Sequence, residues 1–150
     1  MSTRVFVTNW VPVIAWMIVI FAGSTDVLSA EHTSRFLMPF LRWLDPHISL
    51  ATIATTNIVL RKLGHLTEYA ILAALFWRAL RAALTSTSIL WIGGITFVAS
   101  GLFAVSDEFH QSFVGTRTAS AQDVLIDLTG ALIAVATCWL FASRRALQKS

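Results

Sequence analysis

The sequence predicts an all-α integral membrane protein, built as a bundle of four transmembrane helices with a short interfacial amphipathic helix between the first two. Three observations lead to this fold class. The 150 residues are 56% hydrophobic and only 13% charged, which is too apolar for an ordinary soluble domain. Four apolar segments approach the roughly 20 residues that a helix needs to cross a bilayer. No Pro-, Gly- or Ser-rich linker divides the chain, so residues 1–150 are predicted to form a single membrane domain.

The first predicted span runs from Val5 to Gly23. A secretory signal peptide is the alternative for this segment, because Arg4 precedes the apolar run and residues 27–30 loosely resemble a cleavage site. The run is longer than the apolar region of a usual signal peptide, and a single arginine is a short basic region. Both features favour a membrane span.

The other three predicted spans follow a long connection. They run from about Leu63 to Leu80, from about Ile89 to Val105, and from Val124 to Ala142. Within the connection, apolar residues recur at helical spacing while Arg35 and Arg42 lie elsewhere on the helical wheel; the apolar positions are Phe36, Leu37, Phe40, Leu41 and Leu44. This pattern is typical of a helix that lies in the membrane interface, and Asp45-Pro46 ends it. We expect a further short helix over residues 47–60, leading into the second span.

The basic residues predict the orientation in the membrane, because short loops rich in Lys and Arg face the cytoplasm. Basic residues precede the first span, separate the second from the third and follow the fourth: Arg4, Arg78, Arg81, Arg144, Arg145 and Lys149. We therefore expect both termini in the cytoplasm and residues 24–62 and 106–123 on the outer side.

The remaining composition excludes other classes of protein. The net charge of +3 does not indicate a nucleic-acid partner, because no basic stripe with interleaved aromatic residues occurs. The lipid bilayer is the expected partner. The single cysteine, Cys138, lies in an apolar run, so it gives neither an intrachain disulfide nor a metal-ligand spacing. The sequence indicates no oligomeric state.

Two polar clusters are not explained by the need to span a bilayer. In the first, His65, Glu68 and Tyr69 lie on one helical stripe at the outer end of the second span, just after Arg61 and Lys62. The second cluster follows the third span and enters the fourth; its members are Asp107, Glu108, His110, Gln111, Arg117, Asp123 and Asp127. Ionisable residues at this depth are costly unless they are partnered or hydrated. Both clusters lie on one predicted face, where three helix ends can converge.

Two aspartates at the start of the fourth span have local alternatives. Asp123 directly precedes the apolar run and suits an N-cap, whose side-chain oxygen accepts free backbone N–H groups. Asp127 lies one turn further on, so the two carboxylates would repel each other if both were ionised. We expect one of them to meet Arg117 or to carry a proton.

The ordered strings in these clusters resemble the VanZ-like family. Its members typically show Arg-Lys-x-x-His-x-x-Glu-Tyr, then Asp-Glu-x-His-Gln, an Arg, and Asp-Val-x-x-Asp/Asn-x-x-Gly at the start of the last helix. This chain supplies Arg61, Lys62, His65, Glu68, Tyr69, Asp107, Glu108, His110, Gln111, Arg117, Asp123, Val124, Asp127 and Gly130. The resemblance is strongest over residues 61–131. It departs at Leu66, where Phe is common, and at Gly115-Thr116, where Pro-Gly is usual before the arginine.

The resemblance implies a bacterial protein of the inner (cytoplasmic) membrane that acts on or near the cell envelope. The family's founding member is associated with low-level resistance to the glycopeptide teicoplanin. Because many relatives occur in bacteria with no resistance cluster, that phenotype carries over to this chain only weakly.

A binding pocket is the first function that suits these residues. Arg117 with Lys62 or Arg61 would hold a carboxylate or phosphate of a lipid-linked wall precursor or a phospholipid headgroup, because the guanidinium group presents a planar fork of donors to such anions. The other residues that we expect to contact the substrate are Tyr69, Asp107, Gln111, Asp123 and Asp127.

Catalysis and metal binding are the alternatives. In a hydrolase or transferase, Glu108 or Glu68 would act as the general base, His65 or His110 would move a proton, and Arg117 would stabilise developing negative charge. A zinc or manganese site would draw its ligands from His65, His110, Glu68, Glu108 and Asp123. Their spacing matches no recognised ligand motif, so we predict no metal site, and the residues name no other cofactor.

A purely structural network is the simplest alternative. Hydrogen bonds between membrane helices contribute about 0.6 kcal/mol each on average, which is little against the cost of desolvating several charges. Ser, Thr or small residues would lock the helix ends at lower cost. The residue types therefore favour a functional pocket over a purely structural network.

Overall fold

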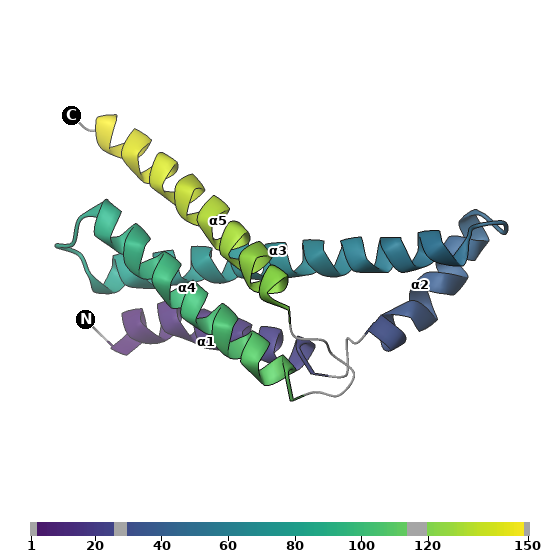
Figure 1. Cartoon of the computed structure of the whole chain (residues 1–150). Helices are drawn as coiled ribbons and strands as arrows, with labels where there is room; N and C mark the ends of the chain where they lie inside the picture. Colours follow the sequence, from purple (N-terminus) through teal and green to yellow (C-terminus); the bar gives the residue numbers. More distant parts are fainter. Residues whose placement is uncertain (1–2, 26–29, 114–119, 149–150) are drawn as a thin grey trace.

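The computed structural model describes residues 3–25, 30–113 and 120–148, and this part of the chain forms five helices (Figure 1). In chain order they are α1 (Thr3–Gly23), α2 (Ala30–Leu44), α3 (Leu50–Ala83), α4 (Ile89–Gln111) and α5 (Ala121–Leu147). The described ranges contain no strand. The predicted all-α class is confirmed for them.

Three of these helices are long and apolar enough to cross a membrane: α1, α4 and the part of α5 that ends at Arg145. Their outward surfaces carry large apolar side chains that no other part of the chain covers, among them Phe6, Ile18, Leu102 and Leu132. A surface of this kind is stable against lipid and unfavourable in water. The multi-pass membrane class predicted from composition is thereby supported.

The helix α3 differs from the second span that the sequence predicts. It runs without a break over 34 residues, so residues 50–60 are its first turns and not a separate short helix. The side chain of Ser49 accepts the backbone N–H of Thr52 and caps its start. A helix of this length measures roughly 50 Å, well beyond the ~30 Å hydrocarbon core. Because charged residues lie in its middle, over 61–68, α3 is not among the three helices that are apolar enough to cross a membrane.

The other helices are arranged around α3 (Figure 1). The helices α1, α4 and α5 pack along its second half, and α2 lies beside its first half, which extends beyond the bundle. Val13 and Ile20 of α1 are buried in a core with Leu72 of α3 and Ala104 of α4. A helix that supplies core residues in this way is better explained as a retained span than as a cleaved signal peptide.

The helix α5 crosses α3 at very close range. A Cβ atom at Gly130 would lie 2.2 Å from the backbone oxygen of Leu66, so only glycine fits at this crossing. The crossing sets the first turns of α5 against the middle of α3. His65 and Asp127 therefore lie within reach of each other.

The helix α2 matches the amphipathic segment predicted between the first two spans. It begins at Ala30, earlier than the predicted pattern, and ends at Leu44, directly before Asp45-Pro46. Phe40, Trp43 and Leu44 are exposed on it.

Candidate functional site

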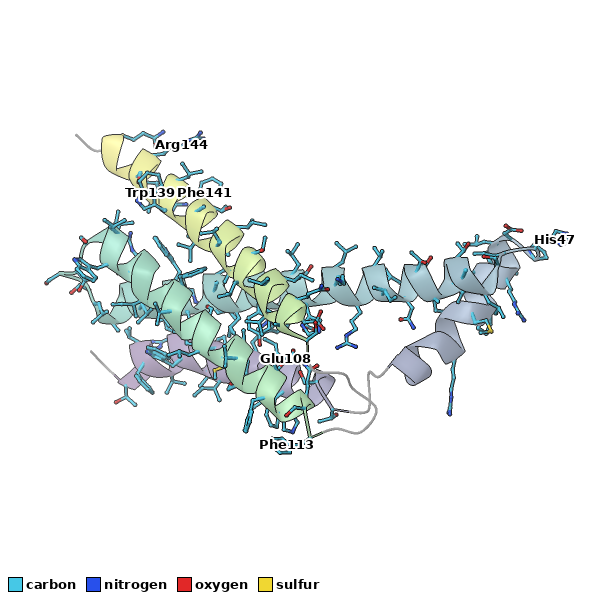
Figure 2. All side chains as sticks on the ribbon, viewed as in Figure 1. His47, Glu108, Phe113, Trp139, Phe141 and Arg144 are labelled. Atoms are coloured by element: carbon cyan, nitrogen blue, oxygen red, sulfur yellow. The ribbon has the colours of Figure 1, made fainter. Side chains whose placement is uncertain are left out.

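Polar side chains from four helices gather at one end of the bundle. The end of α1, the middle of α3, the end of α4 and the start of α5 contribute to this group, which we call the polar cluster; its described members are Ser24, Arg61, His65, Glu68, Tyr69, Asp107, Glu108, Gln111, Asp123 and Asp127. Figure 2 labels Glu108 at this end of the bundle, and it labels Arg144 at the opposite end. The structure thus brings together the two sequence clusters that the predicted topology assigned to one face.

Two ion pairs join α3 to α5. The Nδ1 atom of His65 lies 3.1 Å from Oδ1 of Asp127, and both side chains are almost fully buried. A guanidinium nitrogen of Arg61 lies 3.1 Å from Oδ2 of Asp123, in a more open position. Each aspartate therefore has a basic partner on α3. The predicted contact with Arg117 lies outside the described residues, so the expectation that one aspartate meets Arg117 or carries a proton stays a prediction.

Asp123 does not act as the expected N-cap. It lies in the first turn of α5, and its carboxylate binds Arg61. The backbone N–H of Gln122 instead donates to the side-chain oxygen of Ser120, the residue that directly precedes the helix.

A triangle of hydrogen bonds joins α1 to α4. The hydroxyl of Ser24 donates to Oδ2 of Asp107 at 2.7 Å, and the amide nitrogen of Gln111 donates to the same oxygen at 3.1 Å and to the Ser24 hydroxyl at 3.2 Å. The amide oxygen of Gln111 also lies 3.5 Å from a guanidinium nitrogen of Arg61. Gln111 thus links the triangle to the ion pairs. Sequence reasoning did not propose Ser24 as a site residue; its only signal was the run of small residues that ends the first span.

Four buried polar atoms of the cluster lack a hydrogen-bond partner among the described residues: Nε of Arg61, the Tyr69 hydroxyl, Oδ1 of Asp107 and Oε2 of Glu108. The other oxygen of Glu108, Oε1, accepts the backbone N–H of Ser120. Four carboxylates lie within electrostatic range of the fully buried Tyr69 hydroxyl: Glu68, Asp107, Glu108 and Asp127. Leaving a buried polar group unpaired costs about 1–3 kcal/mol. Four such atoms in one cluster therefore lower stability, which favours a role other than structure for at least some of them.

Three further predicted site residues, Glu68, His110 and Lys62, are only partly buried. Glu68 is half-buried, and its backbone oxygen accepts the indole N–H of Trp16 at 2.9 Å, which fixes α1 against α3. The ring of His110 lies 4.0 Å from that of Phe21, centroid to centroid, and its buried Nδ1 has no partner among the described residues. Lys62 is half-buried beside Arg61. Arg117, with Gly115-Thr116 before it, lies outside the described residues.

The His65–Asp127 pair has a definite chemical consequence. In the neutral imidazole the nitrogen that faces the carboxylate carries the proton, so Nδ1 is the N–H donor and Nε2 is the basic nitrogen; once Nε2 takes a proton, the two side chains form an ion pair. A buried aspartate orients the catalytic imidazole in the same way in acyl-transfer enzymes. The geometry therefore suits proton transfer at His65.

The described residues give the metal alternative no support. No group of three or more His, Cys, Asp or Glu side chains in the described ranges is placed to hold a metal ion. Asp123 and Asp127 pair with basic groups, and Asp107 and Glu108 accept hydrogen bonds from a hydroxyl and a backbone N–H.

Comparison with known proteins adds one finding. A family model described as VanZ/LLP1 matches residues 9–142, which include all the described members of the polar cluster. No curated protein and no solved structure matched the chain.

Proposed function

The chain belongs to the VanZ/LLP1 family, and on that premise we propose that it binds or modifies a cell-envelope component at the polar cluster, in the cytoplasmic membrane of a bacterium. One observation carries this proposal. Four helices converge on a group of buried ionisable side chains in which the Tyr69 hydroxyl, Asp107 Oδ1 and Glu108 Oε2 have no described partner. Unpaired polar atoms that converge in a buried site favour a ligand site.

The proposal includes α3 as a fourth membrane span, with both termini in the cytoplasm and the polar cluster towards the outer side. Two features of α3 support it. His65 and Tyr69, two of the polar residues in the middle of the helix, are buried against protein and so do not meet lipid. Arg78 and Arg81 at its end form a basic flank of the kind that stays in the cytoplasm.

The described contacts divide the cluster into a rim and an interior. Arg61 is held by Asp123, so we assign the binding of a phosphate or carboxylate on a lipid-linked wall precursor or phospholipid to Lys62, and to Arg117 on the strength of the sequence motif alone. Five carboxylates lie in the cluster: Glu68, Asp107, Glu108, Asp123 and Asp127. An interior of that charge repels an anion and suits the transfer of protons.

A membrane-embedded hydrolase or transferase acting on a lipid-linked or phosphorylated substrate is the second candidate, and the His65–Asp127 pair favours it. Asp127 fixes the imidazole so that Nε2 can take a proton from a water molecule or a substrate hydroxyl. Glu108, with its free oxygen, is a second candidate base, and the Tyr69 hydroxyl can donate a hydrogen bond to developing negative charge.

A comparison of lipids tests the proposal. Cells expressing the wild type, Glu108→Gln or the control Asp45→Asn at equal membrane levels are extracted, and both total lipids and lipids that co-purify with the protein are measured by mass spectrometry. Asp45 is exposed in the turn between α2 and α3, so its substitution leaves the cluster intact. Modification predicts an envelope species whose total abundance depends on Glu108, and binding predicts a co-purifying species with unchanged totals. Identical lipids for the wild type and Glu108→Gln in both measurements would leave only the structural network.

A link to glycopeptide resistance, implied by the family resemblance, has its own test. In a susceptible host, expression of the wild type is expected to raise the inhibitory concentration of teicoplanin, and Glu108→Gln to abolish the increase. A wild type without effect on susceptibility removes the resistance role and leaves the envelope role standing.

A further inference from the structure

The two ends of the bundle carry opposite charge. All eight acidic residues lie in 26–68 or 107–127, and none lies in 1–25, 69–106 or 128–150. The acid-free ranges hold six of the 11 basic residues: Arg4, Arg78, Arg81, Arg144, Arg145 and Lys149. Figure 2 labels Arg144 at the basic end and Glu108 at the acidic end.

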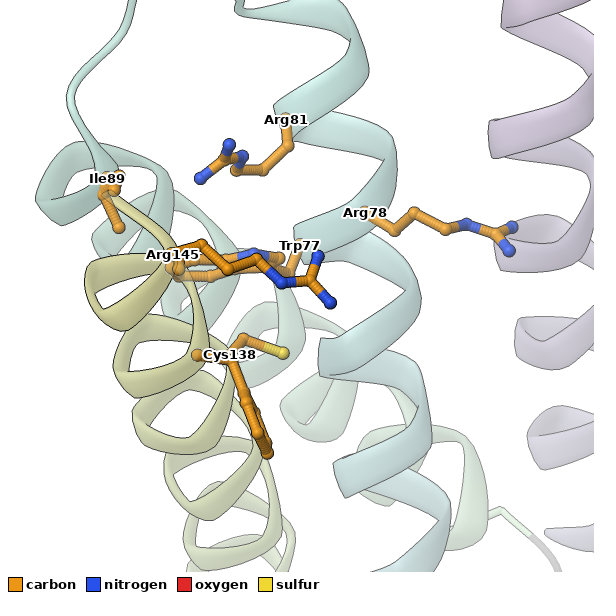
Figure 3. A pocket seen from close by; sticks show the side chains of 8 residues that line it. Trp77, Arg78, Arg81, Ile89, Cys138 and Arg145 are labelled. Atoms are coloured by element: carbon orange, nitrogen blue, oxygen red, sulfur yellow. The ribbon is translucent and has the colours of Figure 1, made fainter. Parts of the chain in front are cut away.

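The basic end contains a cavity of about 730 Å³ between α3 and α5, closed on one side by the start of α4 (Figure 3). Two kinds of side chain line it. Arg81 and Arg145 reach into it from α3 and α5, and the apolar wall includes Trp77, Ile89, Cys138 and Phe141. The wall meets the outer surface of the bundle through Phe141, which is exposed.

The two arginines are available for a ligand. Both are exposed, and the ion pairs of the described residues involve neither of them. Arg78 also lines the cavity, but its guanidinium points towards α1 (Figure 3), where it donates to the backbone oxygen of Thr8 at 3.4 Å. Arg81 and Arg145 therefore form a basic rim, and Arg78 belongs to the packing of α3 on α1.

We propose that this cavity binds the headgroup of an anionic glycerophospholipid. The phosphate lies between Arg81 and Arg145, whose planar donor forks suit a phosphate, and the first carbons of the acyl chains lie along Trp77 and Phe141. Basic pockets between membrane helices at the cytoplasmic side are suited to anionic lipid headgroups. The apolar wall favours a lipid over free phosphate, since a free anion gains nothing from aromatic and aliphatic side chains.

Native mass spectrometry of the full chain in detergent provides the test, with phosphatidylglycerol and phosphatidylcholine of identical acyl chains as probes. We expect the wild type to bind phosphatidylglycerol more tightly than phosphatidylcholine. Arg81→Gln and Arg145→Gln should each weaken that binding about fivefold, the effect of one basic residue near an anionic lipid. The matched control is Arg144→Gln, which removes the same charge from the next position but does not line the cavity. It should bind phosphatidylglycerol as the wild type does.

A second readout locates the lipid. Cys138 is the only cysteine of the chain and lines the cavity, so bound phosphatidylglycerol should slow its alkylation by a small maleimide. Half-maximal protection should need about fivefold more lipid in Arg145→Gln than in the wild type. Equal affinity for the two lipids overturns the proposal, as does equal weakening by Arg144→Gln and Arg145→Gln. If millimolar inorganic phosphate displaces the lipid with the same dependence on Arg81, the site binds a free anion and the lipid assignment is wrong. The substituted arginines are exposed, so the variants are expected to fold.

Discussion

The ionisable residues of the polar cluster differ greatly in burial, and this difference determines what each contributes. The side chains of His65 and Asp127 are 8% and 1% exposed, whereas those of Arg61 and Asp123 are 29% and 10% exposed. A buried pair loses most of its Coulomb gain to desolvation, but removing one member leaves the other stranded. When one member of a partly exposed pair is removed, water hydrates the remaining charge, so the loss of stability is small.

Substitution at Asp127 should therefore destabilise the protein more than substitution at Asp123. We expect Asp127→Ala to lower the free energy of unfolding by about 1–3 kcal/mol, because the buried Nδ1–H of His65 loses its acceptor. A double-mutant cycle between His65→Ala and Asp127→Ala should give a coupling of about 0.6–1.7 kcal/mol. Unfolding in mixed detergent measures both. A larger coupling in the matching Arg61–Asp123 cycle would contradict this ranking.

Two neighbouring acidic residues separate structural from functional roles. Oδ2 of Asp107 accepts hydrogen bonds from Ser24 and Gln111, while Oε2 of Glu108 has no described partner. We expect Asp107→Ala to lower Tm by several degrees, since it strands two donors. Glu108→Gln keeps the oxygen that accepts the Ser120 N–H and should leave Tm unchanged or raise it, as is common when a functional residue is replaced. If Glu108→Gln lowers Tm as much as Asp107→Ala does, Glu108 is a structural partner.

At the scale of single elements, the sequence predicted the apolar helices well and α3 poorly. Apolar runs of span length are visible directly, so α1, α4 and α5 appear close to the predicted bounds. The length of α3 was missed because charged residues from Arg61 to Glu68 were taken as a span boundary. Neither Pro nor Gly lies between Leu50 and Leu63, so the backbone had no reason to break there. A mean hydropathy treats His65 and Glu68 as if they faced lipid, whereas His65 is buried against α5.

The crossing of α5 over α3 depends on Gly130. We expect Gly130→Ala to destabilise the protein by about 1–3 kcal/mol through overpacking, because its Cβ would lie 2.2 Å from the Leu66 oxygen. Moving α5 away would also weaken the His65–Asp127 contact. The matched control is Gly94→Ala, where nothing lies within 4 Å of the added Cβ, so the better helix propensity of alanine should leave stability equal or higher. Thermal unfolding in detergent compares the two. Equal behaviour of the two variants would mean that the helices are not held this closely.

At the scale of the whole molecule, the sequence predicted which residues meet but not how they pair. Orientation and span order placed His65, Glu108 and Asp127 near one another without any coordinates. The partners depend on the angle and depth of the crossing at Gly130, on the extra turns of α3 and on Ser24 at the end of α1, and none of these follows from periodicity. The charge pattern, by contrast, is visible in the sequence, because no acidic residue lies in 1–25, 69–106 or 128–150.

The four-span topology makes a prediction about access from each side of the membrane. In a Cys138→Ser background, which removes the only cysteine, His47→Cys and Ser86→Cys place single thiols in exposed turns before and after α3. If α3 crosses the membrane with both termini in the cytoplasm, an impermeant maleimide should label the first variant in intact spheroplasts and the second only after permeabilisation. The Cys138→Ser parent shows the background. Labelling of both variants in intact spheroplasts would mean that α3 does not cross, and the reverse pattern would mean that the polar cluster faces the cytoplasm.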